Sequence, residues 1–372
     1  PAHIPYFDAV WTWNNAGVAY VNNTLEARSA AGTSFSILAN ASNRLYLGSS
    51  VRFDLATFEL AVAGSGLGTL TYEYSSALTG GNVTGWTEFV PLIGYTFDGA
   101  GGGERFDTLS LTGWVSGAFT ASAPHGATPP DTTARYWVRI YSSAVTTAPT
   151  VNRMKMRPYP GYALFTDVSN QLGLSTDFSS TTIPTATTVE DYLHAATAFI
   201  DYKTWKSWRP NLAYREEHDF NISGIKLKEK YPWTVLSLEV WDGGSYDLRT
   251  QGRDNDYFLV AETGMIHFAR YFLLPARLQS YSAPVWGWGW GEFTFATRIS
   301  YLFGRDIHED EKQGGVVWDI AKKLAAIDIV QNTDYSTWTV TGADKIALDR
   351  KVENWKMETE EKLESLRGWV TF

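Results

Sequence analysis

The character of the chain changes near residue 180, and this change limits the folds that the chain can adopt. Residues 1–180 contain 9 Lys and Arg and 12 Asp and Glu, whereas residues 181–372 contain 22 and 28. The first part is rich in Gly, Ser, Thr and Ala, and the second part has many charged residues. At ~150 residues per domain, a chain of 372 residues also has the length of two domains or slightly more. We therefore predict an α+β protein with two domains.

Short runs of alternating residues fill the first part and predict β-strands. Gly-rich turns separate these runs, and regular short strands with such turns are typical of an antiparallel sandwich. The predicted strands include Leu45–Leu47, Phe58–Val62, Leu70–Tyr74 and Tyr136–Tyr141, and the predicted turns include Gly64–Gly66, Gly80–Gly81 and Gly99–Gly103. We expect residues 1–178 to form an antiparallel β-sandwich, with no helix before residue 180.

A stretch of Ser, Thr and Pro at residues 179–188 is predicted to be a linker. Thr187 and Glu190 have the spacing of a capping box, so a helix should begin there. Apolar residues then recur at helical spacing, at Val189, Leu193, Ala196 and Ile200. The dipeptide Arg209–Pro210 marks the end of this helix, because proline restricts the residue before it.

Residues 189–372 are predicted to form a small helical bundle with a β-hairpin or sheet insertion. The insertion should contain strands at Val235–Val240, Tyr257–Val260, Met265–Phe268 and Thr297–Leu302, with the middle two joined as a hairpin. Two helices should follow, with apolar stripes at Val317, Ile320, Leu324 and Ile327, and at Leu348, Val352, Trp355, Leu363 and Leu366. We expect Glu358 and Lys362 to form an i,i+4 ion pair on the last helix.

The composition excludes several classes of chemistry. The chain has no cysteine, which excludes disulfide scaffolds, Cys-ligated zinc and thiol catalysis. A net charge of -9 disfavours unspecific binding of nucleic acid. No apolar stretch reaches the ~18 residues that a membrane span needs, so no membrane partner is expected. The segment Pro1–Pro5 lacks the basic start and apolar run of a signal peptide, so we expect a protein made in the cytoplasm.

The motifs that would indicate an enzyme are missing. Gly64–Gly68 lacks the Lys-Ser/Thr ending of a phosphate-binding loop, and the sequence has no Gly-x-Ser-x-Gly nucleophile elbow. Asp254–Asp256 lacks the central Gly and closing Glu of a calcium loop, and no two histidines have metal-ligand spacing. We therefore predict no catalytic residue, no cofactor and no metal site, and a protein that is not an enzyme.

The second part resembles the head–tail adaptor, or connector, family of tailed viruses, and the first part resembles β-sandwich modules of virion proteins. The order of elements over residues 185–370 carries the first resemblance, at Glu190–Leu193, Phe199–Asp201, Trp205–Arg209, Leu238–Val240, Thr263–Ile266, Arg298–Gly304 and Val316–Val330. The resemblance to β-sandwich modules rests on Leu45–Gly48, Leu70–Tyr74, Gly85–Thr87 and Arg135–Ile140.

The adaptor resemblance implies a closed ring of about twelve copies at the neck of a virion, assembled in the host cytoplasm. Its partners would be further copies of itself, the portal protein and a tail or neck completion protein. The sandwich would add the capsid as an optional partner. Genomic DNA would pass through the lumen without specific binding, because acidic subunits repel phosphates.

Three groups of apolar residues are the candidate contacts with a neighbouring subunit or the portal. Trp286, Trp288 and Trp290 alternate with glycines, so a strand would place all three indoles on one face. That face could dock a neighbour, bind a sugar, or be buried within its own chain. By the resemblance, Trp369, Val370 and Phe372 would anchor in a portal groove, although a frayed terminus is the alternative. Trp355, on the last helix, completes the set.

Two further functions remain open at this point. A carbohydrate-binding adhesion protein of a tail, baseplate or capsid would account for the sandwich and the Trp286–Trp290 row. A glycosidase would need two carboxylates that face one cleft, and the sequence shows no such pair.

Overall fold

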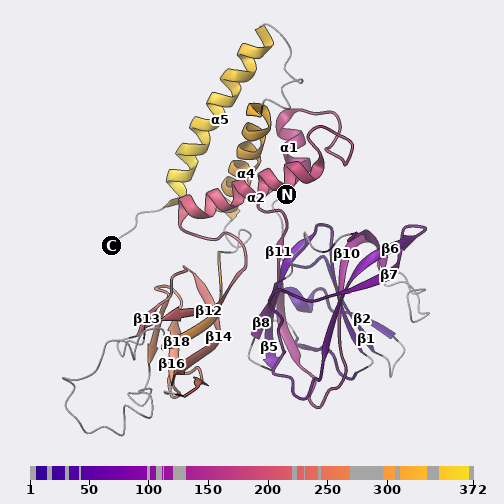
Figure 1. The fold of residues 1–372 in the computed structure, drawn as a ribbon, viewed down its shortest axis with the longest axis vertical. Helices are drawn as coiled ribbons and strands as arrows, with labels where there is room; N and C mark the ends of the chain where they lie inside the picture. The colour runs from indigo at the N-terminus through magenta and orange to yellow at the C-terminus, as the bar shows by residue number, and fades with distance from the viewer. Residues whose placement is uncertain are drawn as a thin grey trace, which may run out of the picture.

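The structure, a computed structural model, places a layer of helices over two β-regions (Figure 1). The residues it describes are 6–14, 19–29, 33–41, 43–98, 101–105, 111, 113–119, 131–219, 224–229, 231–241, 244–268, 296–305, 311–332 and 343–367. Within them the strands form four sheets, and the chain combines these sheets with helices, so the α+β class is confirmed.

The first β-region contains a seven-stranded sheet and a four-stranded sheet. The larger sheet consists of β1 (Ala9–Asn14), β2 (Ala19–Asn22), β4 (Arg44–Ser49), β6 (Leu70–Thr79), β7 (Asn82–Phe89), β9 (Ser116–Phe119) and β10 (Asp131–Ser142). The smaller sheet consists of β3 (Phe35–Ser36), β5 (Phe53–Val62), β8 (Gly101–Arg105) and β11 (Thr150–Pro158). Their orders are β2-β1-β4-β10-β6-β7-β9 and β3-β11-β5-β8, and the long pairings are antiparallel.

Strand alternation explains how these two sheets make a core. Leu45 and Leu47 of β4 join the same buried cluster as Phe58 of β5 and Met154 of β11, so both sheets contribute to it. Tyr46, between the two leucines, belongs to a second buried cluster instead, because successive residues of a strand point to opposite faces. The seven-stranded sheet is therefore packed on both faces.

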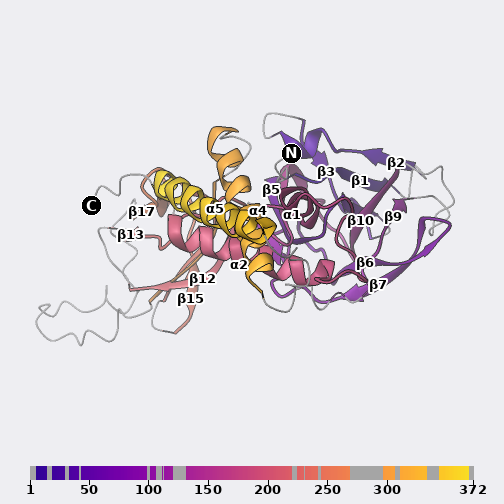
Figure 2. The same ribbon diagram turned by 90° about the horizontal axis from the view of Figure 1, so that it is seen from above.

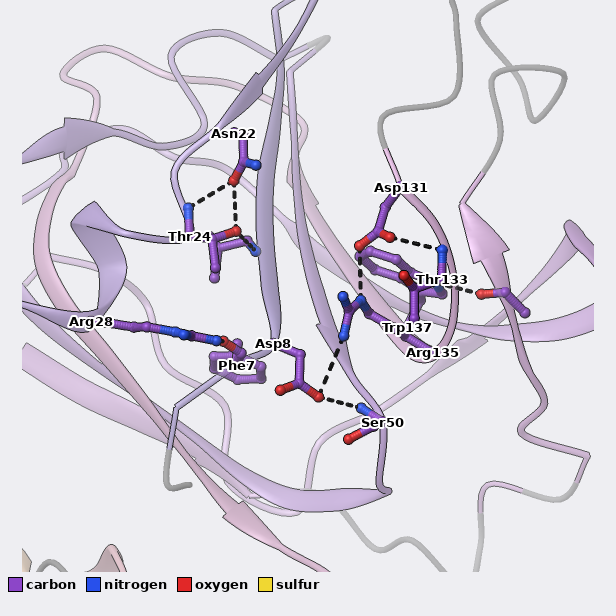
Figure 3. Close-up of polar contacts among 12 residues, drawn as sticks. Phe7, Asp8, Asn22, Thr24, Arg28, Ser50, Asp131, Thr133, Arg135 and Trp137 are labelled. Atoms are coloured by element: carbon purple, nitrogen blue, oxygen red, sulfur yellow. Dashed lines mark hydrogen bonds and ion pairs between the residues drawn. The ribbon is translucent and has the colours of Figure 1, made fainter. Parts of the chain in front are cut away.

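Polar contacts join the ends of neighbouring strands in the middle of this sheet (Figure 3). The Asp8 carboxylate accepts the Ser50 N–H at 2.6 Å and lies 3.5 Å from Arg135. Arg135 Nε also donates to Asp131 at 2.8 Å, and Asp131 accepts the Thr133 N–H at 2.9 Å. These bonds hold β1, β4 and β10 together where their ends meet the solvent.

The second β-region lies in sequence between two helices of the helical layer, as an insertion. One sheet has the order β12-β18-β14-β15 and the other β13-β17-β16. Their bounds are β12 (Asn211–His218), β13 (Ile225–Lys226), β14 (Pro232–Trp241), β15 (Tyr246–Leu248), β16 (Tyr257–Val260), β17 (Met265–Phe268) and β18 (Thr297–Phe303). The predicted hairpin is confirmed, because β16 pairs with β17 in antiparallel register.

The helical layer consists of α1 (Phe165–Leu172), α2 (Ala186–Thr204), α4 (Glu311–Gln331) and α5 (Ala343–Arg367), and a 3-10 turn lies earlier at Glu26–Arg28. Seen from above, α5 lies over the line of α2 (Figure 2), and Figure 1 shows that the two helices meet at the end of α2 and diverge from there. The predicted stripe of α2 is confirmed, because Val189, Leu193, Ala196 and Ile200 are all at most 3% exposed. Val317 and Ile320 of α4 and Val352 of α5 pack into the same cluster.

Three local predictions are wrong. Residues 165–172 form helix α1, although no helix was expected before residue 180. Two residues mark its ends: the Asp167 carboxylate accepts the Leu164 N–H at 2.9 Å, and Gly173 ends the helix at φ 74°. Gly101–Arg105, expected to lie partly in a turn, is strand β8, because glycines can pair through their backbone with β5. The predicted bounds of α2 are wrong at both ends, because it is capped by Thr185 instead of Thr187 and ends at Thr204, before Arg209–Pro210.

The predicted ion pair on the last helix is also wrong. Lys362 binds Asp319 of α4 at 2.8 Å, and Glu358 binds Lys323 of α4 at 2.5 Å. The charges therefore join two helices instead of supporting one. The domain bounds at 178 and 189 stay a prediction; in the structure Tyr162, Val168 and other side chains of residues 162–178 pack into the helical cluster.

Candidate interface site

A buried polar network lies between α2 and the first β-region. Tyr162 donates a hydrogen bond to Asp201 of α2 and accepts the Trp208 N–H at 2.7 Å. Next to it, Arg157 of β11 donates two bonds to Asp54 of β5, at 2.7 and 2.8 Å. This bidentate pair is of the strong, charge-assisted kind, so α2 has a rigid base.

Burial shifts the acid–base behaviour of this network. Desolvation raises the pKa of Asp201 to about 6, and the positive charge of Arg209 only partly opposes this shift. Desolvation and the neighbouring Asp201 raise the pKa of Tyr162 well above its usual value. For Arg157, desolvation lowers the pKa, but Asp54 outweighs it and the net shift is upward.

The opposite face of α2 exposes a row of aromatic side chains, which we call the α2 row: Phe199, Tyr202 and Trp205. Their exposed fractions are 41%, 69% and 62%. The rings of Tyr202 and Trp205 are 6.2 Å apart, and the Lys203 ammonium lies 5.4 Å from the Phe199 ring. Large exposed apolar side chains that gather at one place mark interaction sites in soluble proteins.

Trp205 is held in a conformation that favours glycine. It ends α2 with φ 55° and ψ 33°, and its N–H donates to the Asp201 carbonyl. A left-handed residue at a helix end is most often Gly, because a Cβ there costs about 1 kcal/mol. Strain of this kind persists where the surrounding structure requires it, and here it holds an indole out into solvent.

A groove of about 300 Å³ between α2 and α5 adjoins the α2 row. Phe199, Leu324 and Leu363 give it an apolar lining, and its charged residues are Lys203, Lys356, Glu360, Glu364 and Arg367. Thr359 also lines it and is 3% exposed; within the described part of the chain its hydroxyl has no hydrogen-bond partner. Apolar residues bordered by charges of both signs fit an apolar side chain that is flanked by polar groups.

The end of α5 is fixed at this groove by two bonds to the end of α2. Arg367 Nε donates to the Lys203 carbonyl at 2.9 Å, and Lys206 Nζ donates to the Leu366 carbonyl at 2.9 Å. The α2 row and the groove therefore lie on one rigid surface.

Most of the residues predicted as interface contacts lie outside the described residues: Trp286, Trp288, Trp290, Trp369, Val370 and Phe372. Trp355 is described, is 6% exposed and packs in the helical cluster, so its own chain accounts for its burial. The carbohydrate-binding alternative rested on the sandwich and on the Trp286–Trp290 row, and the row lies outside the described residues.

Sequence reasoning missed the α2 row. Its residues recur three apart, on the side of α2 that the stripe Val189, Leu193, Ala196 and Ile200 leaves to solvent. Aromatic residues on the polar side of an amphipathic helix were the signal that could have found it.

The described residues hold no group of three or more His, Asp or Glu that could bind a metal. None of the described helices is long and apolar enough to cross a membrane.

Comparisons with known proteins give little for this chain. No family model and no curated protein matches it. A chain of the virion of a native gene transfer agent particle is similar at 18% identity, over 53% of this chain and 91% of that one, with a TM-score of 0.28. A chain of the neck of an empty gene transfer agent particle is similar at 18% identity, over 51% and 87%, with a TM-score of 0.28. At these TM-scores the likeness carries no argument about this chain.

Proposed function

We propose that this chain is a structural, non-enzymatic virion protein: a head–tail adaptor that forms a ring beneath the portal. Genomic DNA passes through the centre of the ring, and the tail or neck assembles on it. The observation that carries the proposal is the α2 row beside the α2–α5 groove. It is an exposed apolar surface on a rigid helical layer, which is what a contact between copies needs.

A closed ring requires this surface to contact a neighbouring copy. In a cyclic assembly one face of a subunit meets a different face of the next, so each copy must present a fixed surface to its neighbour. The α2 row is fixed by the bonds between the ends of α2 and α5. The order α2, inserted sheets, α4 and α5 is also the order that the resemblance to the adaptor family implies.

The first β-region serves in this proposal as a β-sandwich domain that is added to the adaptor and contacts the capsid. Its two sheets contribute to one common core, which supports the sandwich assignment. A role without catalysis is supported by the position of Asp201, the carboxyl whose pKa is raised to about 6: it lies beneath α2, bonded to Tyr162, and does not line the α2–α5 groove.

Mass photometry and class averages of the purified full chain test the proposal. We expect closed rings of a single subunit type, and Trp205→Gly should shift the protein to monomers. The substitution removes the indole and suits the left-handed backbone, so the monomer should stay folded by circular dichroism. Tyr214→Ala, which removes an exposed aromatic side chain from β12, is the control and should leave the rings intact.

A strictly monomeric wild type at all concentrations and in the presence of portal would overturn the proposal. Rings that survive Trp205→Gly unchanged would overturn the assignment of the α2 row as their interface.

A further inference from the structure

A second groove, of about 560 Å³, lies where the two β-regions meet. Figure 1 shows the two β-regions side by side beneath the helices, and Leu55, Leu212 and Leu302 pack together between them. We call it the basic groove, because Arg153, Lys155 and Arg305 line it against one carboxylate, Glu262. This volume lies in the range of pockets that hold small organic ligands, and it is far larger than a bare ion requires.

Aromatic rings hold two of these cations in place. The Lys155 ammonium is 4.7 Å from the centre of the Trp233 ring, and the lysine is 6% exposed. The Arg305 guanidinium lies 5.3 Å from the Tyr231 ring. A cation packed against a ring costs less to position for a ligand than one on a free side chain, because its rotamer entropy has already been lost. Arg305 also donates to the Gln313 side chain at 2.6 Å, which helps to hold it in place, and Arg153 is paired with Glu59 at 2.9 Å.

Trp233, which lines this groove, carries a buried donor that lacks an acceptor in the described part of the chain. Among the described residues, Nε1 of Trp233 is buried and has no hydrogen-bond partner. A buried N–H without an acceptor is unfavourable, and an oxygen atom of a ligand would relieve this cost. A donor together with two held cations favours an anion with several oxygens. The aromatic walls, Tyr231 and Trp233, favour a flat apolar group attached to it.

We propose that the basic groove binds a nucleoside phosphate, with the phosphate at Lys155 and Arg305 and the base against Tyr231 and Trp233. The same chemistry occurs in a free nucleotide and in a single nucleic-acid strand, where phosphates meet basic residues and bases stack on aromatic ones. The site does not depend on ring formation and is separate from the α2 row.

Titration of the full chain with three probes tests this site: thymidine monophosphate and inorganic phosphate by calorimetry, and a short fluorescein-labelled oligo(dT) by anisotropy. Thymidine monophosphate should bind more tightly than inorganic phosphate, and Arg305→Gln should weaken it about tenfold or more, because one charge-assisted contact is lost. Arg298→Gln is the matched control: this arginine also lies over a tyrosine ring, Tyr246, but outside the groove, and its loss should change nothing.

Trp233→Phe is the second variant, because it keeps an aromatic ring beside Lys155 but removes the indole donor and part of the aromatic surface; it should weaken binding severalfold even where Arg305→Gln fails to fold. Binding of thymidine monophosphate supports a free nucleotide as the ligand, and binding of oligo(dT) alone supports a strand. Three results would overturn the site: no binding by the wild type, equal binding of inorganic phosphate and thymidine monophosphate, or equal losses in Arg305→Gln and Arg298→Gln.

Discussion

The first β-region and the helical layer both contain many aromatic residues, but they use them in opposite ways. In the seven-stranded sheet, Trp13 and Trp137 are 2% and 0% exposed, whereas Tyr202 and Trp205 at the end of α2 are 69% and 62% exposed. An aromatic content of 15% therefore does not by itself indicate a surface made for partners. The position of each ring on its element decides whether it serves the core or a contact.

The sheet can bury so many rings because both of its faces are covered. The second cluster, on the face of Tyr46, contains Trp13 and Trp137, and the Trp137 indole donates to the Gly117 carbonyl at 2.9 Å. Strand β9, which carries Gly117, pairs with both β7 and β10, and so brings backbone over this face. Burial also raises the pKa of Tyr20 and Tyr46 in this cluster, as expected for phenols removed from water.

The largest expected effect is on the buried aromatic residues of the seven-stranded sheet. Trp137→Ala should lower the free energy of unfolding by about 4 kcal/mol, because it empties a fully buried site against Gly48 and removes a hydrogen bond. Urea denaturation of the full chain, at a concentration that keeps the protein monomeric, measures it. Trp205→Ala, an equal change on an exposed residue, is the control; similar losses for the two variants would remove the distinction between the regions.

The second prediction concerns the junction beneath α2. The Asp201 carboxyl has a pKa of about 6 in the folded chain, against an ordinary value of 3.8. Its contribution to stability is therefore complete below about pH 4 and is lost as the pH rises through about 6. Relative to Asp201→Asn, which does not titrate, the wild type should lose about 2 kcal/mol between about pH 4 and pH 7, after allowance for partial exposure.

Chemical denaturation of both proteins across that range checks this prediction. A difference that stays constant with pH, or that grows in favour of the wild type, would mean that Asp201 is stabilised as a carboxylate.

The third prediction tests how the helical layer is held together. Asp319 of α4 binds Lys323 and Lys362 at 2.8 Å. Desolvation raises the pKa of Asp319, but the lysines outweigh it and the net shift is downward. Asp319→Asn should cost about 1 kcal/mol at neutral pH, since partly exposed ion pairs contribute little each but act here as a network. Thermal unfolding in low and high salt measures it, with Glu353→Gln as an exposed control. Equal midpoints for the two variants would count against the network.

The smallest effect is expected on the α2 row itself. Tyr202→Ala should change the free energy of unfolding of the monomer by less than about 0.5 kcal/mol, because the ring is mostly in solvent. Denaturation at a concentration that keeps the protein monomeric is the measurement. A loss above about 1 kcal/mol would show that the row serves the fold of its own chain.

Periodicity predicted most of the elements but not their partners. The stripe of α2 and the hairpin β16–β17 follow from local spacing, and both are confirmed. Helix α1 was missed because eight residues give too few turns for a stripe, and its packing on α4 comes from distant sequence. Glu358 and Lys362 were paired wrongly because i,i+4 spacing only makes a contact available; α4 supplied the actual partners.

The two grooves could not be predicted from the spacing of residues along one element, because each is formed by segments that are distant in sequence. Lys155 of β11 and Trp233 of β14 are far apart in sequence and meet only because the two β-regions pack against each other. The α2–α5 groove likewise needs the packing that sets Phe199 beside Leu363.

The sequence by itself determined the alternation of the strands, the apolar stripes of the long helices and the change in charge density near residue 180. These properties follow from the spacing of side chains along one element, which neighbours in sequence fix. The tertiary structure alone decided which aromatic rings are core and which are exposed. Exposure depends on what covers each face, and those covering segments are distant in sequence: β9 over Trp137, and nothing described over the Tyr202 and Trp205 rings at the end of α2.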